Sequence, residues 1–365
     1  MRFLYTARPL FILATLNCLL ACSGDKTPAS GTEQLRPDEQ AQAERAIDNF
    51  RHIVEKNRGD YVGRGAHAKG HSCVKAYFHV LENIGPAFRH GVFTTPDRTY
   101  KAWIRFSNAN SNYLKSRDIN KDAHGMAIKL IGIDQVPLTR AADGSPPTQD
   151  FLMADNPNFF SANIEDYNQF LEAENYLDFF FGGMNPFNWH IREFMIALDT
   201  LKEPPGSPLW ITYHSNTAYK LGPNNIKFSA RPCNAGTSVY PVDADNPDFM
   251  RDNLARELGA GQGCFTFLIQ VQDPGQGMPI EDPSIEWDTD DAPFQPLARI
   301  TIPQQSFTST EQKEFCENLS FSPWHALPEH RPLGQFNRIR KQVYRASSDY
   351  RHGQNDTRVP TDLDW

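Results

Sequence analysis

Residues 340–355, RKQVYRASSDYRHGQN, form a strongly charged segment close to the end of a chain of 365 residues. Arg340 precedes Tyr344 by four residues and Arg351 follows it by seven, so a helix would place all three on one face. Taken alone, the pattern fits an exposed pair of Arg340 and Tyr344 on the helix surface. Such a pair would stabilise the helix by roughly 0.2–0.5 kcal/mol. It also allows a functional tyrosine held between two arginines. The choice depends on segments far upstream.

Two upstream segments place polar side chains in small or apolar surroundings. In RGAHAKG, residues 64–70, glycine and alanine leave space around the imidazole of His67, as a catalytic or ligand-binding histidine needs. In WIRFSNANSN, residues 103–112, strand alternation puts Arg105 and Ser107 on one face and the phenylalanine between them on the other. An arginine on an apolar strand indicates an anion or a polar network, because a buried charge needs partners. An exposed loop histidine and a solvated strand-end arginine are the alternatives.

Two further segments carry packing signals. In DAHGMAIKL, residues 122–130, Gly125 precedes an alternating strand, which indicates a close backbone approach or a bulge. In ADNPNFF, residues 154–160, a polar turn precedes Phe159 and Phe160. Paired phenylalanines are usually core residues, but they also suit the wall of a pocket for a flat aromatic ligand.

In this order along the chain, the segments resemble the motifs of haem catalases. The resemblance rests on RxxHAKG, RFS, DxxGxAxK, a proline turn followed by FF and a late RxxxY, and it covers about residues 60–355. A looser likeness covers residues 280–305. The chain looks most similar to small catalase-related proteins, which include peroxidases and allene oxide synthases, without the flavodoxin-like domain of large catalases. The resemblance implies an α+β fold, a catalase-like antiparallel β-barrel core wrapped by helices and long loops, with haem buried between the barrel and a C-terminal helix.

The resemblance assigns the proximal haem contacts to the late helix. Tyr344 is the implied axial ligand of the iron, which can be a tyrosine phenolate in haem proteins. A free phenol has a pKa of about 10, so Arg340, one turn earlier, is implied to hydrogen-bond and stabilise the phenolate. Arg351 is implied to lie near the haem propionates. The expected cofactor is haem, of the b type.

The resemblance assigns the distal chemistry to the upstream segments. His67 is the implied general base and acid, which moves a proton between the two peroxide oxygens. Ser107 is implied to hydrogen-bond the other ring nitrogen of this histidine. Arg64 and Arg105 match the arginines that pair with propionates, because carboxylates suit bidentate guanidinium contacts. Of the two phenylalanines, Phe160 is the better match for the residue that walls the distal pocket.

The distal turn departs from the family pattern. Asp155 occupies the position of the family's distal asparagine, and Asn156 follows one step along. A carboxylate accepts hydrogen bonds rather than donating them to peroxide, and its charge would raise the pKa of His67. Two possibilities stay open at this point: the turn shifts so that Asn156 reaches the haem, or the distal site has altered chemistry.

These assignments predict a haem-dependent oxidoreductase that breaks down hydrogen peroxide or organic hydroperoxides like a catalase or peroxidase. One alternative is a fatty-acid hydroperoxide dehydratase of the allene oxide synthase kind. Another is a haem-binding lipoprotein with weak catalysis, which Asp155 would favour. A surface binding protein without haem would leave the ordered motifs unexplained.

The first residues resemble an export signal. Arg2 and Arg8 precede an apolar run over residues 10–21, which is too short for a permanent bilayer span. The run ends in LLAC and resembles the lipobox of bacterial lipoproteins, in which Cys22 would become the lipidated N-terminus. A plain secretory signal cleaved near Ala21 is the alternative.

The predicted organisation is a lipoprotein-type signal peptide over residues 1–21, a flexible tether over residues 22–36 and a single catalase-like haem domain over residues 37–365. The protein is expected to be exported to the periplasm or the outer membrane, with a lipid anchor as its only membrane contact. A balance of 44 acidic against 36 basic residues gives no indication of a nucleic-acid partner. A homo-oligomer is left open.

Hydrophobic periodicity and β-branched or aromatic runs predict the main elements. Strands are predicted over residues 73–82, 100–109, 125–133, 264–272 and 295–303. Helices are predicted over residues 38–57, 311–319 and 334–350, and the interval 150–200 is interpreted as mostly helical. In an oxidising compartment the four cysteines after Cys22 can pair, and Cys233 with Cys264 is the pairing we expect, with unpaired buried thiols as the alternative.

Overall fold

A closed β-barrel forms the centre of the protein. The computed structural model describes residues 31–139, 146–183 and 185–365, so the predicted signal lies outside the described residues. The strands form one antiparallel sheet in the order β5-β4-β3-β2-β1-β9-β8-β7-β6, and β5 also pairs with β7, which closes the barrel. The strand bounds are β1 Gly70–Val80, β2 Thr99–Asn108, β3 His124–Leu130, β4 Gln149–Ala154, β5 Tyr213–His214, β6 Tyr219–Leu221, β7 Asn224–Pro232, β8 Gly263–Val271 and β9 Gln295–Ile302. The expected antiparallel barrel of an α+β fold is confirmed.

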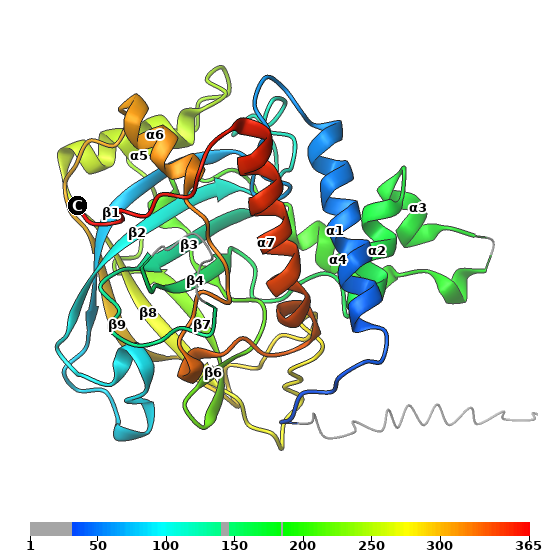
Figure 1. The fold of residues 1–365 in the computed structure, drawn as a ribbon, viewed down its shortest axis with the longest axis horizontal. Helices are drawn as coiled ribbons and strands as arrows, with labels where there is room; N and C mark the ends of the chain where they lie inside the picture. Colours follow the sequence, from blue (N-terminus) through cyan, green and yellow to red (C-terminus); the bar gives the residue numbers. More distant parts are fainter. Residues whose placement is uncertain (1–30, 140–145, 184) are drawn as a thin grey trace, which may run out of the picture.

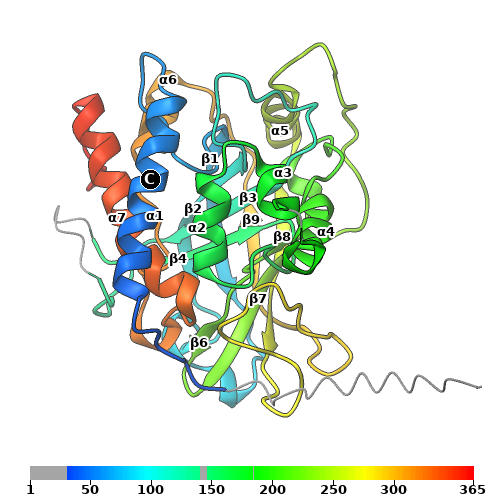
Figure 2. The same ribbon diagram turned by 90° about the vertical axis from the view of Figure 1, so that its right-hand side faces the viewer.

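Helices cover the outside of this barrel. Their bounds are α1 Glu39–Lys56, α2 Ile164–Glu172, α3 Tyr176–Phe181, α4 Ile191–Thr200, α5 Phe249–Ala260, α6 Thr310–Asn318 and α7 Gln335–Asn355. Figures 1 and 2 show α1 and α7 side by side against the barrel, with α2, α3 and α4 gathered next to α1. Within the described ranges, none of these helices is both long and apolar enough to cross a bilayer.

Most predicted elements are confirmed, with one clear error. The five predicted strands correspond to β1, β2, β3, β8 and β9, and the predicted terminal helices correspond to α1, α6 and α7. The interval 150–200 is not helical at its start, because β4 runs to Ala154. Four of the six residues of β4 are buried, so its sequence lacks the alternation that marks a half-exposed strand.

The inside of the barrel is filled by side chains. Phe78, Phe151, Phe228 and Phe267 are buried there, and the rings of Phe151 and Phe267 lie 4.8 Å apart. The ring of Phe267 also lies 5.2 Å from that of Phe78 and 5.6 Å from that of Phe228. A ligand site therefore belongs on the outside of the barrel, where the helices pack.

The described part of the expected tether is held against the domain. Glu33 forms ion pairs with Arg331 at 2.6 Å and with Arg338 at 2.9 Å. Arg36 pairs with Glu165 of α2 at 3.0 Å. Residues 31–36 thus continue the fold and do not form a flexible tether.

Two disulfides link distant parts of the chain. The expected pair Cys233–Cys264 is confirmed and joins the end of β7 to β8. The second disulfide, Cys73–Cys316, joins β1 to α6 across 243 residues of sequence. Nothing in the sequence distinguishes this second pair from two buried thiols.

Candidate functional site

A cavity of about 260 Å³ lies between the outer face of the barrel and α7. The barrel side contributes the loop before β1 and residues of β2, β3 and β4, namely Arg64, His67, Arg105, Ser107, Gly125, Ala127, Leu152 and Ala154. Helix α7 contributes Phe336, Ile339, Arg340, Val343, Tyr344, Ser347, Ser348 and Arg351. Helices α1 and α2 close the remaining side with Ala46, Phe50, Ile164 and Tyr167. The motifs that lie far apart in the sequence therefore meet around one space.

The alternation of β2 aims its polar residues at this cavity. Arg105 and Ser107 line the cavity, whereas Phe106 is buried in the main hydrophobic core. The expected split between the two faces of the strand is confirmed. The structure also gives Arg105 a local role, because its Nη2 donates to the carbonyl of His67 at 2.9 Å.

His67 is held in a defined and unusual conformation. Its φ is 51°, a region that residues other than glycine seldom adopt and that often marks functional sites. Its Nδ1 lies 3.1 Å from the Ser107 hydroxyl, and its Nε2 makes no hydrogen bond to any described residue. Burial, assisted by the nearby charge of Arg105, lowers the pKa of His67 to about 4. The imidazole is therefore neutral at pH 7 and has one ring nitrogen to spare.

Gly125 provides the space that the imidazole occupies. A Cβ at this position would lie 2.5 Å from Nδ1 and 2.6 Å from Cε1 of His67, and 3.0 Å from the Ser107 hydroxyl. The glycine stands opposite Ser107 in the β2–β3 register. The close backbone approach predicted from the sequence is confirmed, and a larger residue here would displace His67.

Tyr344 enters the cavity from α7. Its hydroxyl makes no hydrogen bond within the described ranges, although it lines the cavity together with Arg340, one turn earlier. Arg340 donates to the side chain of Asn337 at 3.3 Å, and no hydrogen bond joins it to the tyrosine in this structure. Burial acts to lower the pKa of Arg340, but the phenols of Tyr344, Tyr219 and Tyr167 outweigh it and the pKa is raised. The guanidinium is therefore a fixed positive charge close to the phenol.

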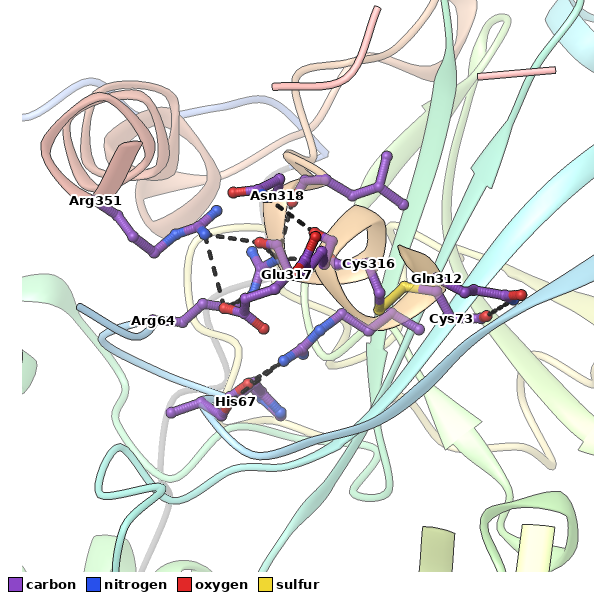
Figure 3. The surroundings of a disulfide bond; sticks show 12 residues. Arg64, His67, Cys73, Gln312, Cys316, Glu317, Asn318 and Arg351 are labelled. Atoms are coloured by element: carbon purple, nitrogen blue, oxygen red, sulfur yellow. Dashed lines mark hydrogen bonds and ion pairs between the residues drawn. A yellow bond between two sulfur atoms is a disulfide. The ribbon is translucent and has the colours of Figure 1, made fainter. Parts of the chain in front are cut away.

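An arginine cluster, Arg64, Arg105 and Arg351, borders the cavity. Figure 3 shows two of its members, Arg64 and Arg351, beside Glu317. Arg64 donates to the carbonyls of Glu317 and Leu319, both at 2.9 Å, and Arg351 donates to the Glu317 carbonyl at 2.7 Å. The Glu317 carboxylate lies 3.7 Å from both Arg64 Nε and Arg351 Nη1. Burial and the charge of Arg351 lower the pKa of Arg64 to about 9, which still leaves it charged at pH 7.

The arginine cluster has more positive charge than its protein partners balance. Among the described ion pairs, Arg64 and Arg351 share the one carboxylate of Glu317, and Arg105 has no carboxylate within ion-pair distance. The Nε atoms of Arg64 and Arg105 are buried and find no hydrogen-bond partner among the described residues. Buried donors and charges without partners are costly. The cluster therefore suits a ligand that brings one or more carboxylates.

The distal turn does not bring Asn156 to the cavity, so the first of the two possibilities left open above is wrong and the distal site is altered. Ala154 and Phe159 of the segment 154–160 line the cavity, whereas Asp155 and Asn156 do not. Asp155 turns to His124 and lies 2.7 Å from its Nδ1. Asn156 is buried, and its side-chain oxygen and nitrogen have no hydrogen-bond partner among the described residues. The charge of Asp155 does act to raise the pKa of His67, but burial outweighs it.

The paired phenylalanines have different surroundings. Phe159 lines the cavity and packs edge-on against Tyr167 and Phe336, at 5.2 and 5.3 Å between ring centroids. Phe160 is not among the cavity-lining residues and packs against Phe170 of α2, at 4.7 Å. The structure thus brings Phe159 to the site rather than the expected Phe160.

Sequence reasoning missed part of the cavity wall. Ser215 and Asn216 line the cavity from the segment after β5. Asn216 has a φ of 56°, and its Nδ2 donates to the carbonyl of Asn156 at 2.5 Å and to that of Asn158 at 3.2 Å. Asn216 thereby fixes the turn that carries Ala154 and Phe159. Its sequence context, HSNTAY, holds no periodic or charged pattern that would have identified it.

The closed barrel with a long C-terminal helix packed on its outer face is the fold of catalases. A fungal catalase matches with a TM-score of 0.61 and 17% identity over 86% of this chain, and catalase A from Saccharomyces cerevisiae with 0.64 and 18% over 92%. A bacterial catalase matches with a TM-score of 0.54 and 15% identity over 84% of this chain. The likeness to catalases expected from the motifs is confirmed for the fold.

The similarity has two boundaries. This chain spans 63% of the length of the fungal catalase, 68% of catalase A and 60% of the bacterial catalase. No family model matches the sequence, and no curated protein matches it. The activity of this chain must therefore be argued from its own residues.

Proposed function

We propose that the protein binds haem in the cavity between the barrel and α7 and breaks down hydrogen peroxide or organic hydroperoxides, as a catalase or peroxidase does. One observation carries the proposal. A neutral imidazole, His67, and a phenol without a hydrogen-bond partner in the described structure, Tyr344, enter the same cavity from different elements. Bound haem would supply the redox-active iron for cleaving the O–O bond.

The residues around the cavity fit haem in chemical type. Tyr344 is the residue that would coordinate the iron, and the positive charge of Arg340 would favour its phenolate form. The arginine cluster would take the two propionates, because its surplus of buried positive charge lacks carboxylate partners among the described residues. Phe159, Val343 and Ile339 offer the apolar contact that a porphyrin face needs.

His67 is the residue that would move the proton. With its hydrogen on Nδ1, the imidazole donates to the Ser107 hydroxyl and leaves Nε2 as an acceptor. Nε2 would take the proton from one peroxide oxygen and return it to the other. Because the pKa of His67 is lowered to about 4, this nitrogen stays available from neutral pH down to mildly acidic pH.

The cell envelope is the location that we propose, with a lipid anchor at Cys22. The support is the lipobox-like sequence together with the disulfides Cys73–Cys316 and Cys233–Cys264, which are typical of oxidising compartments. Labelling of expressing cells with a radioactive fatty acid tests the anchor. Label that is incorporated by the natural sequence and lost in Cys22→Ala is the expected result, and an unlabelled protein contradicts the anchor.

Haem binding and peroxide loss test the activity. We expect the purified protein to bind haemin at one to one, and to consume hydrogen peroxide or cumene hydroperoxide with oxygen release or with oxidation of a phenolic donor. His67→Ala should keep haemin and lose this activity, whereas His79→Ala, on the exposed side of β1, should keep both. Haemin binding without turnover would favour a haem-binding protein, and loss of a fatty-acid hydroperoxide with neither product would favour a dehydratase. A protein that does not bind haemin would contradict the proposal.

A further inference from the structure

Helix α6 joins the barrel to the arginine cluster. On one side, Cys316 forms the disulfide with Cys73 of β1, and Gln312 Nε2 donates to the Cys73 carbonyl at 2.8 Å. On the other side, Arg64 and Arg351 point to Glu317 (Figure 3). The helix therefore lies between a covalent link and two charged side chains of the cavity.

The C-terminal end of α6 sets the positions of these two arginines. The carbonyls of Cys316, Glu317 and Leu319 all accept from Arg64 Nη2, and the carbonyl of Glu317 also accepts from Arg351. These acceptors lie at the negative end of the helix dipole, which favours cations there. Because one short segment binds both guanidinium groups, a shift of α6 would change their spacing.

The disulfide also reaches the third arginine of the cluster. Cys73 is the direct cross-strand partner of Arg105 in the β1–β2 register. The covalent link thus fixes α6 to the strand pair that carries Arg105. The positions of all three arginines are therefore fixed relative to one another. A ligand with two carboxylates needs this kind of fixed spacing.

The apolar packing that holds α6 to the barrel is small. Cys73 and Cys316 belong to a cluster on the outer face, separate from the large core inside the barrel. Its other buried members are Trp103, Ile131, Leu319, Phe321 and Leu363. Partly buried Phe315 of α6 packs against Trp103 at 4.7 Å between ring centroids, and the cross-link over 243 residues adds a covalent constraint to this limited packing.

We propose that the Cys73–Cys316 disulfide is a redox-sensitive device that positions Arg64 and Arg351 for the carboxylates of the cofactor. The inference rests on the proposed haem function and adds a control of cofactor retention to it. A dithiol reductant would transfer two electrons and two protons to the S–S bond, giving two thiols and oxidising the reductant to its own disulfide. Once the disulfide is reduced, α6 moves away from β1 and the arginines no longer keep a fixed spacing. Haem then dissociates faster.

The rate at which haemin leaves the purified protein for an excess of apomyoglobin measures this effect. We expect the Cys73→Ser/Cys316→Ser variant to release haemin at least about tenfold faster, the factor that corresponds to loss of one charge-assisted hydrogen bond. The Cys233→Ser/Cys264→Ser variant is the matched control, because that disulfide lies outside the cavity wall. It should change the rate less than about twofold, which is the scatter expected of a substitution outside the contact.

Haemin dimethyl ester separates positioning from general loosening. The ester lacks free carboxylates, so the arginine cluster cannot bind it through charge. If the disulfide acts through Arg64 and Arg351, its removal should speed the release of haemin but leave release of the ester nearly unchanged. Equal acceleration of both compounds, or of neither, would overturn the inference.

Reduction of the disulfide in the folded haemin complex provides a second test, which holds even where the Cys73→Ser/Cys316→Ser variant does not fold. The folded haemin complex of Cys233→Ser/Cys264→Ser retains only the Cys73–Cys316 disulfide among the described cysteines. Treatment of this complex with a dithiol should accelerate haemin release, and reoxidation should restore the slow rate. Unchanged release after complete reduction would overturn the inference while leaving haem binding intact. Failure of the natural sequence to bind haemin would overturn the proposed function as well.

Discussion

Replacing Gly125 by alanine tests how tightly the structure fixes His67. The added Cβ would lie 2.5 Å from Nδ1 of His67, whereas ordinary contact begins at 3.4 Å. The imidazole would therefore have to move by about 0.9 Å, away from β3. Such a shift breaks the 3.1 Å contact with Ser107 and takes Nε2 from its position in the cavity.

The expected cost follows from this displacement. Forcing a methyl group into a packed site destabilises a fold by about 1–3 kcal/mol. A misplacement of about 1 Å at a reacting group lowers the rate by about 10²-fold. We therefore expect Gly125→Ala to lower both the free energy of unfolding and the peroxide-dependent rate.

Urea unfolding of the apoprotein and initial rates of peroxide loss provide the two readouts. Gly259→Ala is the matched control, since this exposed glycine lies in α5 and no atom lies within 4 Å of the position that an added Cβ would take. Alanine there should leave the rate unchanged and raise stability by up to about 1 kcal/mol. Natural stability and natural rate in Gly125→Ala would refute the packing of His67 against this strand.

Two further predictions concern buried polar groups. Asp155→Ala should lower the free energy of unfolding by about 1–3 kcal/mol, measured by urea unfolding, because it leaves the buried Nδ1 of His124 without its partner; a neutral result would contradict the pairing. Burial lowers the pKa of His71 to about 4, below its unfolded value near 6.5, so the unfolded state binds a proton first as the pH falls. Stability should therefore fall between pH 6.5 and pH 4, by about 1.4 kcal/mol per pH unit for this group, and His71→Gln should flatten the profile by that amount. An unchanged slope in the variant would show that His71 is not buried as a neutral ring.

Local patterns predicted the elements that have clear helical periodicity or runs of β-branched and aromatic residues. The periodic helices α1 and α7 and the β-rich runs of β1, β2 and β8 were all found from spacing and residue type. The ordered motifs also identified several of the residues that line the cavity, including His67 and Tyr344.

Local sequence patterns do not predict which residues far apart in the sequence pair with one another. Strands β4 and β7 were not recognised, because their sequences, QDFLMA and NNIKFSARP, hold no run of β-branched residues. The cross-link Cys73–Cys316 spans 243 residues, and sequence spacing alone does not select such a pair. The turn at Asp155 is likewise set by the register of β4 on β3, which puts Ala154 opposite Gly125 and sends the carboxylate to His124.

The absorption spectrum of the haemin-reconstituted protein tests the central claim most directly. Tyr344→Phe removes only the phenol oxygen, and Tyr350→Phe is the matched control on the same helix, because the Tyr350 hydroxyl bonds to Glu55 of α1. We predict a ferric phenolate spectrum in the natural sequence and in Tyr350→Phe that is lost in Tyr344→Phe. The same spectrum in all three proteins, or no haemin binding in any of them, would contradict coordination of the iron by Tyr344.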